Sequence, residues 1–102
     1  MKDLAYLTAK TGDEFAILRG KTEDILFHGQ SSRCAFDDVL VKLLFNKHLY
    51  IYGHSHPGED IPVPSPQDRE TLKKLGQTDS KLISARTGLE ITFTWDLFGD
   101  FL

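Results

Sequence analysis

The chain has 102 residues, of which 40% are hydrophobic and 26% are charged. This length supports one domain with a modest core, and the composition is typical of a soluble globular protein rather than a disordered one. Because the net charge is -3 and the acidic and basic residues are mixed along the chain, binding of nucleic acid is not expected.

We expect a single domain over residues 1–102 in a cytoplasmic protein. The apolar runs are far too short to cross a membrane, and the first residues lack the apolar core of a secretory signal. The single cysteine, Cys34, has no partner for an internal disulfide, which fits a reducing compartment.

The first part of the sequence predicts three short strands. Residues 4–9 (LAYLTA) and 14–19 (EFAILR) are rich in apolar residues, and Gly12 lies between them, so they are interpreted as a β-hairpin. Residues 24–29 (DILFHG) form the third predicted strand.

Beyond this region the spacing of apolar residues changes. Five apolar residues have the i, i+3, i+4 spacing of an amphipathic helix: Phe36, Val39, Leu40, Leu43 and Leu44. The next residues, 48–53 (HLYIYG), have the β-branched and aromatic content of a strand.

A second helix is predicted after a proline-rich loop. Ser65 is a natural N-cap, Pro66 suits the first helical position, and Gly76 fits just past the end. Two strands, 81–85 and 90–95, complete the order β-β-β-α-β-α-β-β, which indicates an α+β fold with two packing helices.

Two histidines, His54 and His56, stand at the end of the predicted strand 48–53. Side chains at i and i+2 of a strand point to the same face, so both imidazoles would converge on one point. Imidazole nitrogen is a good zinc ligand. The alternative is a pair of surface or hydrogen-bonded histidines, which would have the same spacing.

Asp68 is the candidate third ligand. Ser65 and Asp68 also have the spacing of a capping box, which alone would explain both residues. If residues 57–64 fold back, however, the first turn of the helix lies beside the histidines, and Asp68 could both cap the helix and bind a metal ion. Glu59 and Asp60 could compete as ligands, but a helix fixes Asp68 better than a loop would fix them.

Hydrolysis at such a metal ion also needs a base that accepts a proton from water. The upstream candidates are Asp13, Glu14, Glu23 and Asp24. Glu14 stands out because it begins an apolar run, where a charged residue is unusual. A solvated carboxylate in a hairpin is the alternative interpretation of Glu14.

The segments DEFAILRG, GHSHP and SPQD, in this order, resemble the motifs of the JAB/MPN/JAMM metalloprotease (isopeptidase) superfamily. These motifs are a glutamate, then His-x-His-Pro, then Ser-x-x-Asp. The loop also resembles the RadC-like branch, in which His-x-His-Pro runs into PSPxD. The resemblance spans residues 13–95 and implies a minimal, prokaryotic or phage-type member with the JAB/MPN-like (cytidine-deaminase-like) fold, a curved and mostly antiparallel sheet.

The resemblance also implies a site. His54, His56 and Asp68 would hold one zinc ion per chain, Glu14 would transfer the proton from water to the leaving amine, and Ser65 would donate a hydrogen bond to the oxyanion. The implied activity is zinc-dependent cleavage of a peptide or isopeptide bond, such as removal of a ubiquitin-like or other protein tail that is bound in an extended form.

Two features depart from the family pattern. Eight residues, 57–64, separate His56 from Ser65, which is one more than the family usually has. The usual N-terminal helix is not expected, because the residues before Glu14 are interpreted as a strand. The alternative functions are an inactive binding or scaffold module of the same fold and, ranked last because of the acidic balance, a RadC-like DNA-associated protein.

Overall fold

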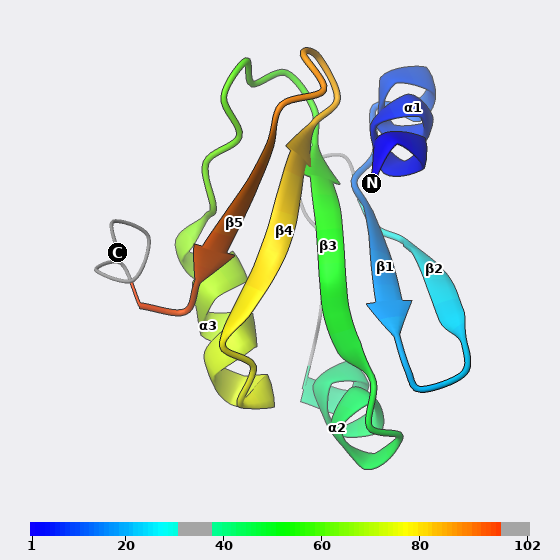
Figure 1. The fold of residues 1–102 in the computed structure, drawn as a ribbon, viewed down its shortest axis with the longest axis vertical. Helices are drawn as coiled ribbons and strands as arrows, with labels where there is room; N and C mark the ends of the chain where they lie inside the picture. The colour runs from blue at the N-terminus through cyan, green and yellow to red at the C-terminus, as the bar shows by residue number, and fades with distance from the viewer. Residues whose placement is uncertain (31–37, 97–102) are drawn as a thin grey trace.

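The strands of the computed structural model form one mixed sheet, and helices pack on both of its faces (Figure 1). The structure describes residues 1–30 and 38–96. In chain order the described elements are α1 (Lys2–Thr11), β1 (Phe15–Arg19), β2 (Asp24–His28), α2 (Asp38–Asn46), β3 (Tyr50–His56), α3 (Pro66–Leu75), β4 (Asp79–Ser84) and β5 (Glu90–Thr94). The α+β class is as predicted, but the described elements include one helix more than the two expected, and their order is α-β-β-α-β-α-β-β.

The extra helix, α1, replaces the strand predicted at residues 4–9, so that prediction was wrong. Leu4 and Thr8, which are one helical turn apart, are buried against the sheet. Gly12 has a left-handed φ of 77° and donates its N–H to the carbonyl oxygen of Thr8, so it ends a helix instead of turning a hairpin. The expectation that no helix precedes Glu14 is overturned as well.

The other two helices lie where they were predicted. Helix α3 begins at Pro66 and ends before Gly76. In α2 Leu44 is buried but Leu43 is exposed, while Cys34 and Phe36 lie outside the described residues. None of the helices in the described part of the chain is both long and apolar enough to span a membrane.

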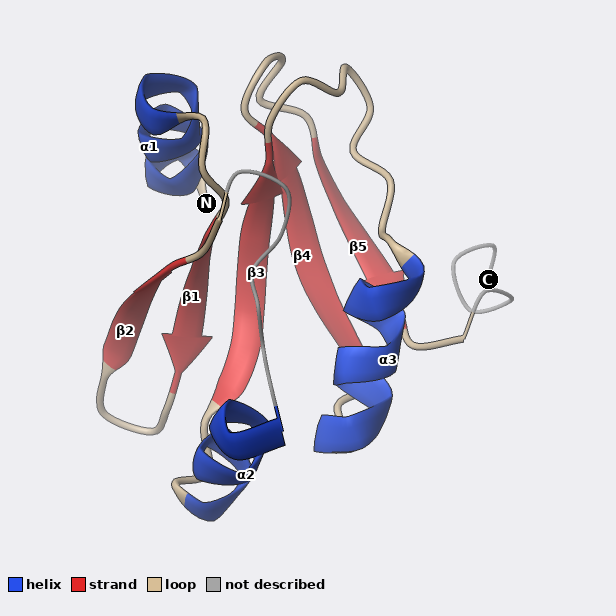
Figure 2. Cartoon of the chain, turned by 180° about the vertical axis from the view of Figure 1, so that it is seen from behind, coloured by secondary structure: helices blue, strands red, loops and turns tan. Residues whose placement is uncertain are grey.

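The strand order is β2-β1-β3-β4-β5 (Figure 1). Three of the four pairings are antiparallel, as predicted, and the β3–β4 pairing is parallel. Parallel neighbours need a crossover connection, which here contains α3. A crossover helix runs back along the strands, so the first turn of α3 lies near the carboxyl end of β3 (Figure 2).

The helices divide between the two faces of the sheet. Successive residues of a strand point to opposite faces, and in β4 Leu82 packs with Leu72 of α3 whereas Ile83 packs with Leu4 of α1. Helix α2 packs beside α3 on the same face (Figure 2). The carboxyl end of β3 therefore lies between α1 on one side and α3 on the other.

Candidate metal centre

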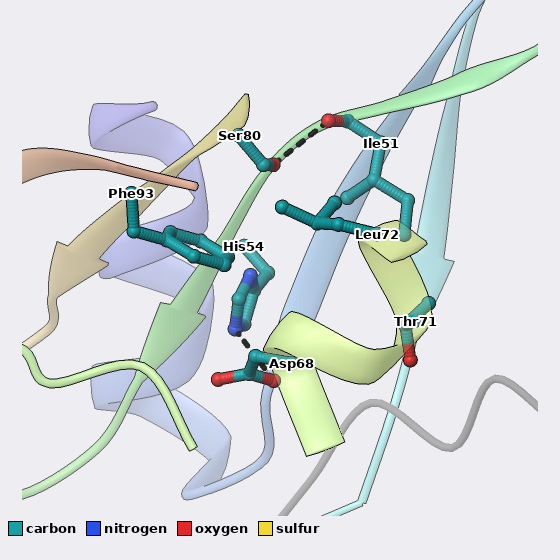
Figure 3. Close-up of a pocket in the computed structure, with 7 residues that line it drawn as sticks. All are labelled: Ile51, His54, Asp68, Thr71, Leu72, Ser80 and Phe93. Atoms are coloured by element: carbon teal, nitrogen blue, oxygen red, sulfur yellow. Dashed lines mark hydrogen bonds and ion pairs between the residues drawn. The ribbon is translucent and has the colours of Figure 1, made fainter. Parts of the chain in front are cut away.

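Strand β3 carries His54 and His56 on the face that α3 covers. The antiparallel register between β1 and β3 shifts at Tyr52, which has no partner residue in β1. An additional residue of this kind interrupts the alternation of faces along a strand. Ile51 and His54, although three positions apart, consequently line one cavity against α3 (Figure 3).

Possible ligand atoms of His54, His56 and Asp68 form a triangle at this point, with the two carboxylate oxygens of Asp68 at one corner. The Nε2 atoms of His54 and His56 lie 3.2 Å apart. Each of them lies 3.3 Å from one carboxylate oxygen of Asp68, which is Oδ1 for His54 and Oδ2 for His56. A tetrahedral zinc ion with bonds of about 2.0–2.1 Å separates its ligand atoms by about 3.3–3.4 Å. The donor atoms and their spacing therefore fit a zinc ion.

Glu14 lies next to this triangle, immediately before β1, and only 4% of its surface is exposed. Its Oε1 is 3.9 Å from Nε2 of His56. Ligand atoms of Glu14, His54 and His56 all lie within 4.8 Å of one another, so this buried group could also hold a metal ion. The shorter distances favour Asp68 over Glu14 as the oxygen ligand.

Asp68 reaches the histidines from the first turn of α3, where it forms the predicted capping box with Ser65. The hydroxyl oxygen of Ser65 accepts the N–H of Asp68 at 3.1 Å, and Oδ2 of Asp68 accepts the N–H of Ser65 at 2.8 Å. These two hydrogen bonds fix the carboxylate on the side of the histidines. Capping and placement at the site are thus compatible.

Acidic groups lie around the histidine pair and act on the pKa of His56. Burial acts to raise the pKa of Asp68, but hydrogen bonds from His54 and His56 outweigh it and hold the pKa of that carboxyl well below its usual range. Burial acts to lower the pKa of His56, but the hydrogen bond to Asp68 and the charges of Glu14 and Glu59 raise that pKa above its ordinary value. This concentration of negative charge favours a bound cation.

His54 is held by apolar packing that the sequence did not indicate. The ring of Phe93, from β5, meets the His54 ring edge-on with centroids 5.9 Å apart. Phe93 and Leu72 lie beside His54 in the cavity, opposite Asp68 (Figure 3). The sequence predicted a strand at 90–95 but did not place Phe93 against His54.

Ser55, between the two histidines, points to the opposite face and is fully buried. Its hydroxyl lies 2.5 Å from the hydroxyl of Thr8 in α1 and accepts the backbone N–H of Phe15 at 3.0 Å. These contacts join α1, β1 and β3 directly behind the site and next to Glu14. This network was not expected from the sequence, because Thr8 was predicted in a strand and lies in α1.

The loop acids Glu59 and Asp60, considered above as competing ligands, lie outside the triangle. Asp60 pairs with Arg86 at 3.1 Å on the surface. Glu59 approaches His56 at the other ring nitrogen, with Oε1 3.4 Å from Nδ1. Neither contact brings a carboxylate oxygen to the Nε2 atoms.

Among the candidate bases, only Glu14 has a described contact with the histidine pair. Asp13 pairs with His28 at 2.8 Å, and Asp24 pairs with an arginine across the β1–β2 hairpin. Glu23 is exposed in the turn of that hairpin.

No protein-family model, no curated protein and no solved structure matches this chain. The resemblance to the JAB/MPN/JAMM superfamily therefore stays an expectation from its motifs, and the site is interpreted from its own geometry.

Proposed function

We propose that this protein is a zinc-dependent hydrolase of peptide or isopeptide bonds, with the ion held by His54, His56 and Asp68. One observation carries the proposal. The Nε2 atoms of His54 and His56 lie 3.2 Å apart, and each lies 3.3 Å from a different oxygen of the Asp68 carboxylate. The buried carboxylate of Glu14 lies 3.9 Å from Nε2 of His56. Two imidazoles and one carboxylate leave a coordination position open, as catalytic zinc sites require.

A zinc ion held by His54, His56 and Asp68 would supply Lewis-acid polarisation of a carbonyl group and would make water at the site more acidic. Glu14 accepts the proton of the attacking water and returns it to the departing amine. The backbone of Glu14 is fixed, since its N–H donates to Gln30 and its carbonyl accepts from Gly29. A base that is held in this way keeps its position while the substrate binds.

Ser65 stabilises the oxyanion. A hydroxyl group accepts and donates hydrogen bonds at the same time. In the capping box the Ser65 oxygen acts as an acceptor, so its hydrogen can be donated to the negative oxygen that forms when the carbonyl is attacked.

The substrate class follows from the motif resemblance. We infer a protein or peptide bound as an extended tail, with a ubiquitin-like tail as one example. Edge strands are a common way to hold such a tail, and β2 and β5 are the outer strands of this sheet.

The proposal is tested by comparing zinc-loaded wild type with Glu14→Gln. Both proteins are incubated with a peptide library and with isopeptide-linked peptides in water enriched in ¹⁸O, and the products are analysed by mass spectrometry. We expect the wild type to produce carboxylates carrying ¹⁸O, and Glu14→Gln to retain zinc and lose about 10²–10⁴-fold in rate.

Equal cleavage rates for the two proteins would show that Glu14 is not the catalytic base. If the wild type binds one zinc ion per chain but cleaves none of the substrates, the proposed hydrolase activity is overturned. The alternative function, a binding module, would then be supported.

A further inference from the structure

The loop between β3 and α3 places a third carboxylate, that of Glu59, behind His56. Oε1 of Glu59 lies 3.4 Å from Nδ1 of His56, on the opposite side of the ring from Asp68. The two ring nitrogens of one histidine therefore face two different carboxylates.

Hydrogen bonds hold both the side chain and the backbone of Glu59 in place. Its Oε2 accepts the backbone N–H of Val63 at 2.7 Å, and its carbonyl oxygen accepts the hydroxyl of Ser84 at the end of β4. The next carbonyl, that of Asp60, accepts the hydroxyl of Thr87 at 2.6 Å. These hydrogen bonds attach the loop to the β4–β5 turn.

We propose that Glu59 is a positioning residue for the metal centre, an inference that rests on the proposed zinc site. A histidine that binds metal through Nε2 must carry its proton on Nδ1. With zinc bound, the carboxylate of Glu59, 3.4 Å from Nδ1, would accept this proton. That hydrogen bond would fix the tautomer and the ring orientation and make Nε2 of His56 a stronger donor to the metal.

This role also gives the long loop a function. Residues 57–64 are one residue longer than the resembled pattern, and the loop reaches the β4–β5 turn before it returns to Ser65. The longer loop supplies the carboxylate and the attachment that holds it.

The test compares zinc affinity in the wild type, Glu59→Gln and Asp60→Asn, measured by competition with a chelator of known affinity. In Glu59→Gln the amide oxygen still accepts the Val63 N–H, but an NH₂ group is turned toward the Nδ1–H of His56. We expect Glu59→Gln to bind zinc about 10–100-fold more weakly. Asp60→Asn removes the same charge one residue away, without contact to the histidine, and is expected to bind as the wild type does.

A second measurement separates positioning from support of the loop. In the zinc-loaded, ¹⁵N-labelled wild type, we expect a downfield His56 Nδ1 proton resonance that exchanges slowly with solvent. In Glu59→Gln this resonance shifts upfield or broadens, whereas a role limited to holding the loop would leave it in place.

The outcomes distinguish this inference from the proposed function. A wild type that binds no zinc refutes both. A wild type that binds zinc, but whose Nδ1 proton exchanges rapidly or whose affinity is unchanged in Glu59→Gln, refutes the role of Glu59 and leaves the zinc site intact.

Discussion

The carboxylate of Asp68 lies against the imidazole of His56, with Oδ2 3.3 Å from Nε2, and the same oxygen accepts the N–H of Ser65 at 2.8 Å. One oxygen atom thus takes part both in the start of α3 and in the candidate site. The hydrogen bonds of the capping box fix the position of the carboxylate, which lowers the cost of ordering it as a ligand.

The two possible ligand sets make opposite predictions for Asp68→Asn and Glu14→Gln. Because Asp68 is closer to both Nε2 atoms, we expect Asp68→Asn to lose stoichiometric zinc and Glu14→Gln to keep it. Zinc per chain, measured by elemental analysis after dialysis, decides between them. The reverse result would assign the oxygen ligand to Glu14.

Ser65→Ala is the matched control for Asp68→Asn, because it removes the side-chain cap of α3 and leaves the three proposed ligands. We expect Ser65→Ala to lose about 0.5–2 kcal/mol of unfolding free energy in urea and to retain its zinc. Loss of zinc together with the cap would mean that the capping box, more than the carboxylate, holds the site together.

Zinc should stabilise the fold, because the folded chain brings the ligands together and the unfolded chain does not. Zinc at 100 times its dissociation constant adds about 2.7 kcal/mol to the unfolding free energy. We expect a higher Tm for the wild type with zinc and no change for His54→Ala. His28→Ala replaces an exposed histidine that also contacts a carboxylate, so its Tm should still rise with zinc. An equal zinc-dependent rise in the Tm of His54→Ala would show that the ion binds at another site.

The network behind the site should matter for stability. Ser55→Ala leaves the N–H of Phe15 and the hydroxyl of Thr8 without the partner that each has now, and we expect it to cost about 1–3 kcal/mol in urea unfolding. Thr8→Val leaves the contact between Ser55 and Phe15 in place and should cost less. A larger loss for Thr8→Val would show that the helix contact dominates.

Helix α1 can be checked with two substitutions. Leu4 is 1% exposed and Tyr6 is 60% exposed, whereas a strand would place both side chains on one face. We expect Leu4→Ala to cost about 2–5 kcal/mol and Tyr6→Ala to cost far less. Similar losses for the two variants would favour the strand that the sequence suggested.

Local rules were sufficient for much of the site. The i, i+2 spacing of His54 and His56 put both on one face, and the capping box fixed the start of α3 at Pro66. Both of these features depend on short-range chemistry, which the sequence contains. The parallel pairing of β3 and β4, whose crossover brings Asp68 to the histidines, was not predicted.

The parts that could not be predicted depend on tertiary contacts. The run LAYLTA is apolar enough for a strand, and only burial of Leu4 and Thr8 against the sheet reveals the helical period. The packing of Phe93 against His54 and the contact of Glu59 with Nδ1 join segments whose distance apart no local pattern encodes.

Tyr52, which has no partner residue in β1, decides which face of the sheet the later side chains of β3 point to. Deleting this one residue would restore strict alternation between β1 and β3, and every later side chain of β3 would change faces. His54 and His56 would then point toward α1, and Ser55 would point toward Asp68. An insertion or deletion of one residue in this strand would therefore take the candidate metal centre apart while leaving every candidate ligand in the sequence.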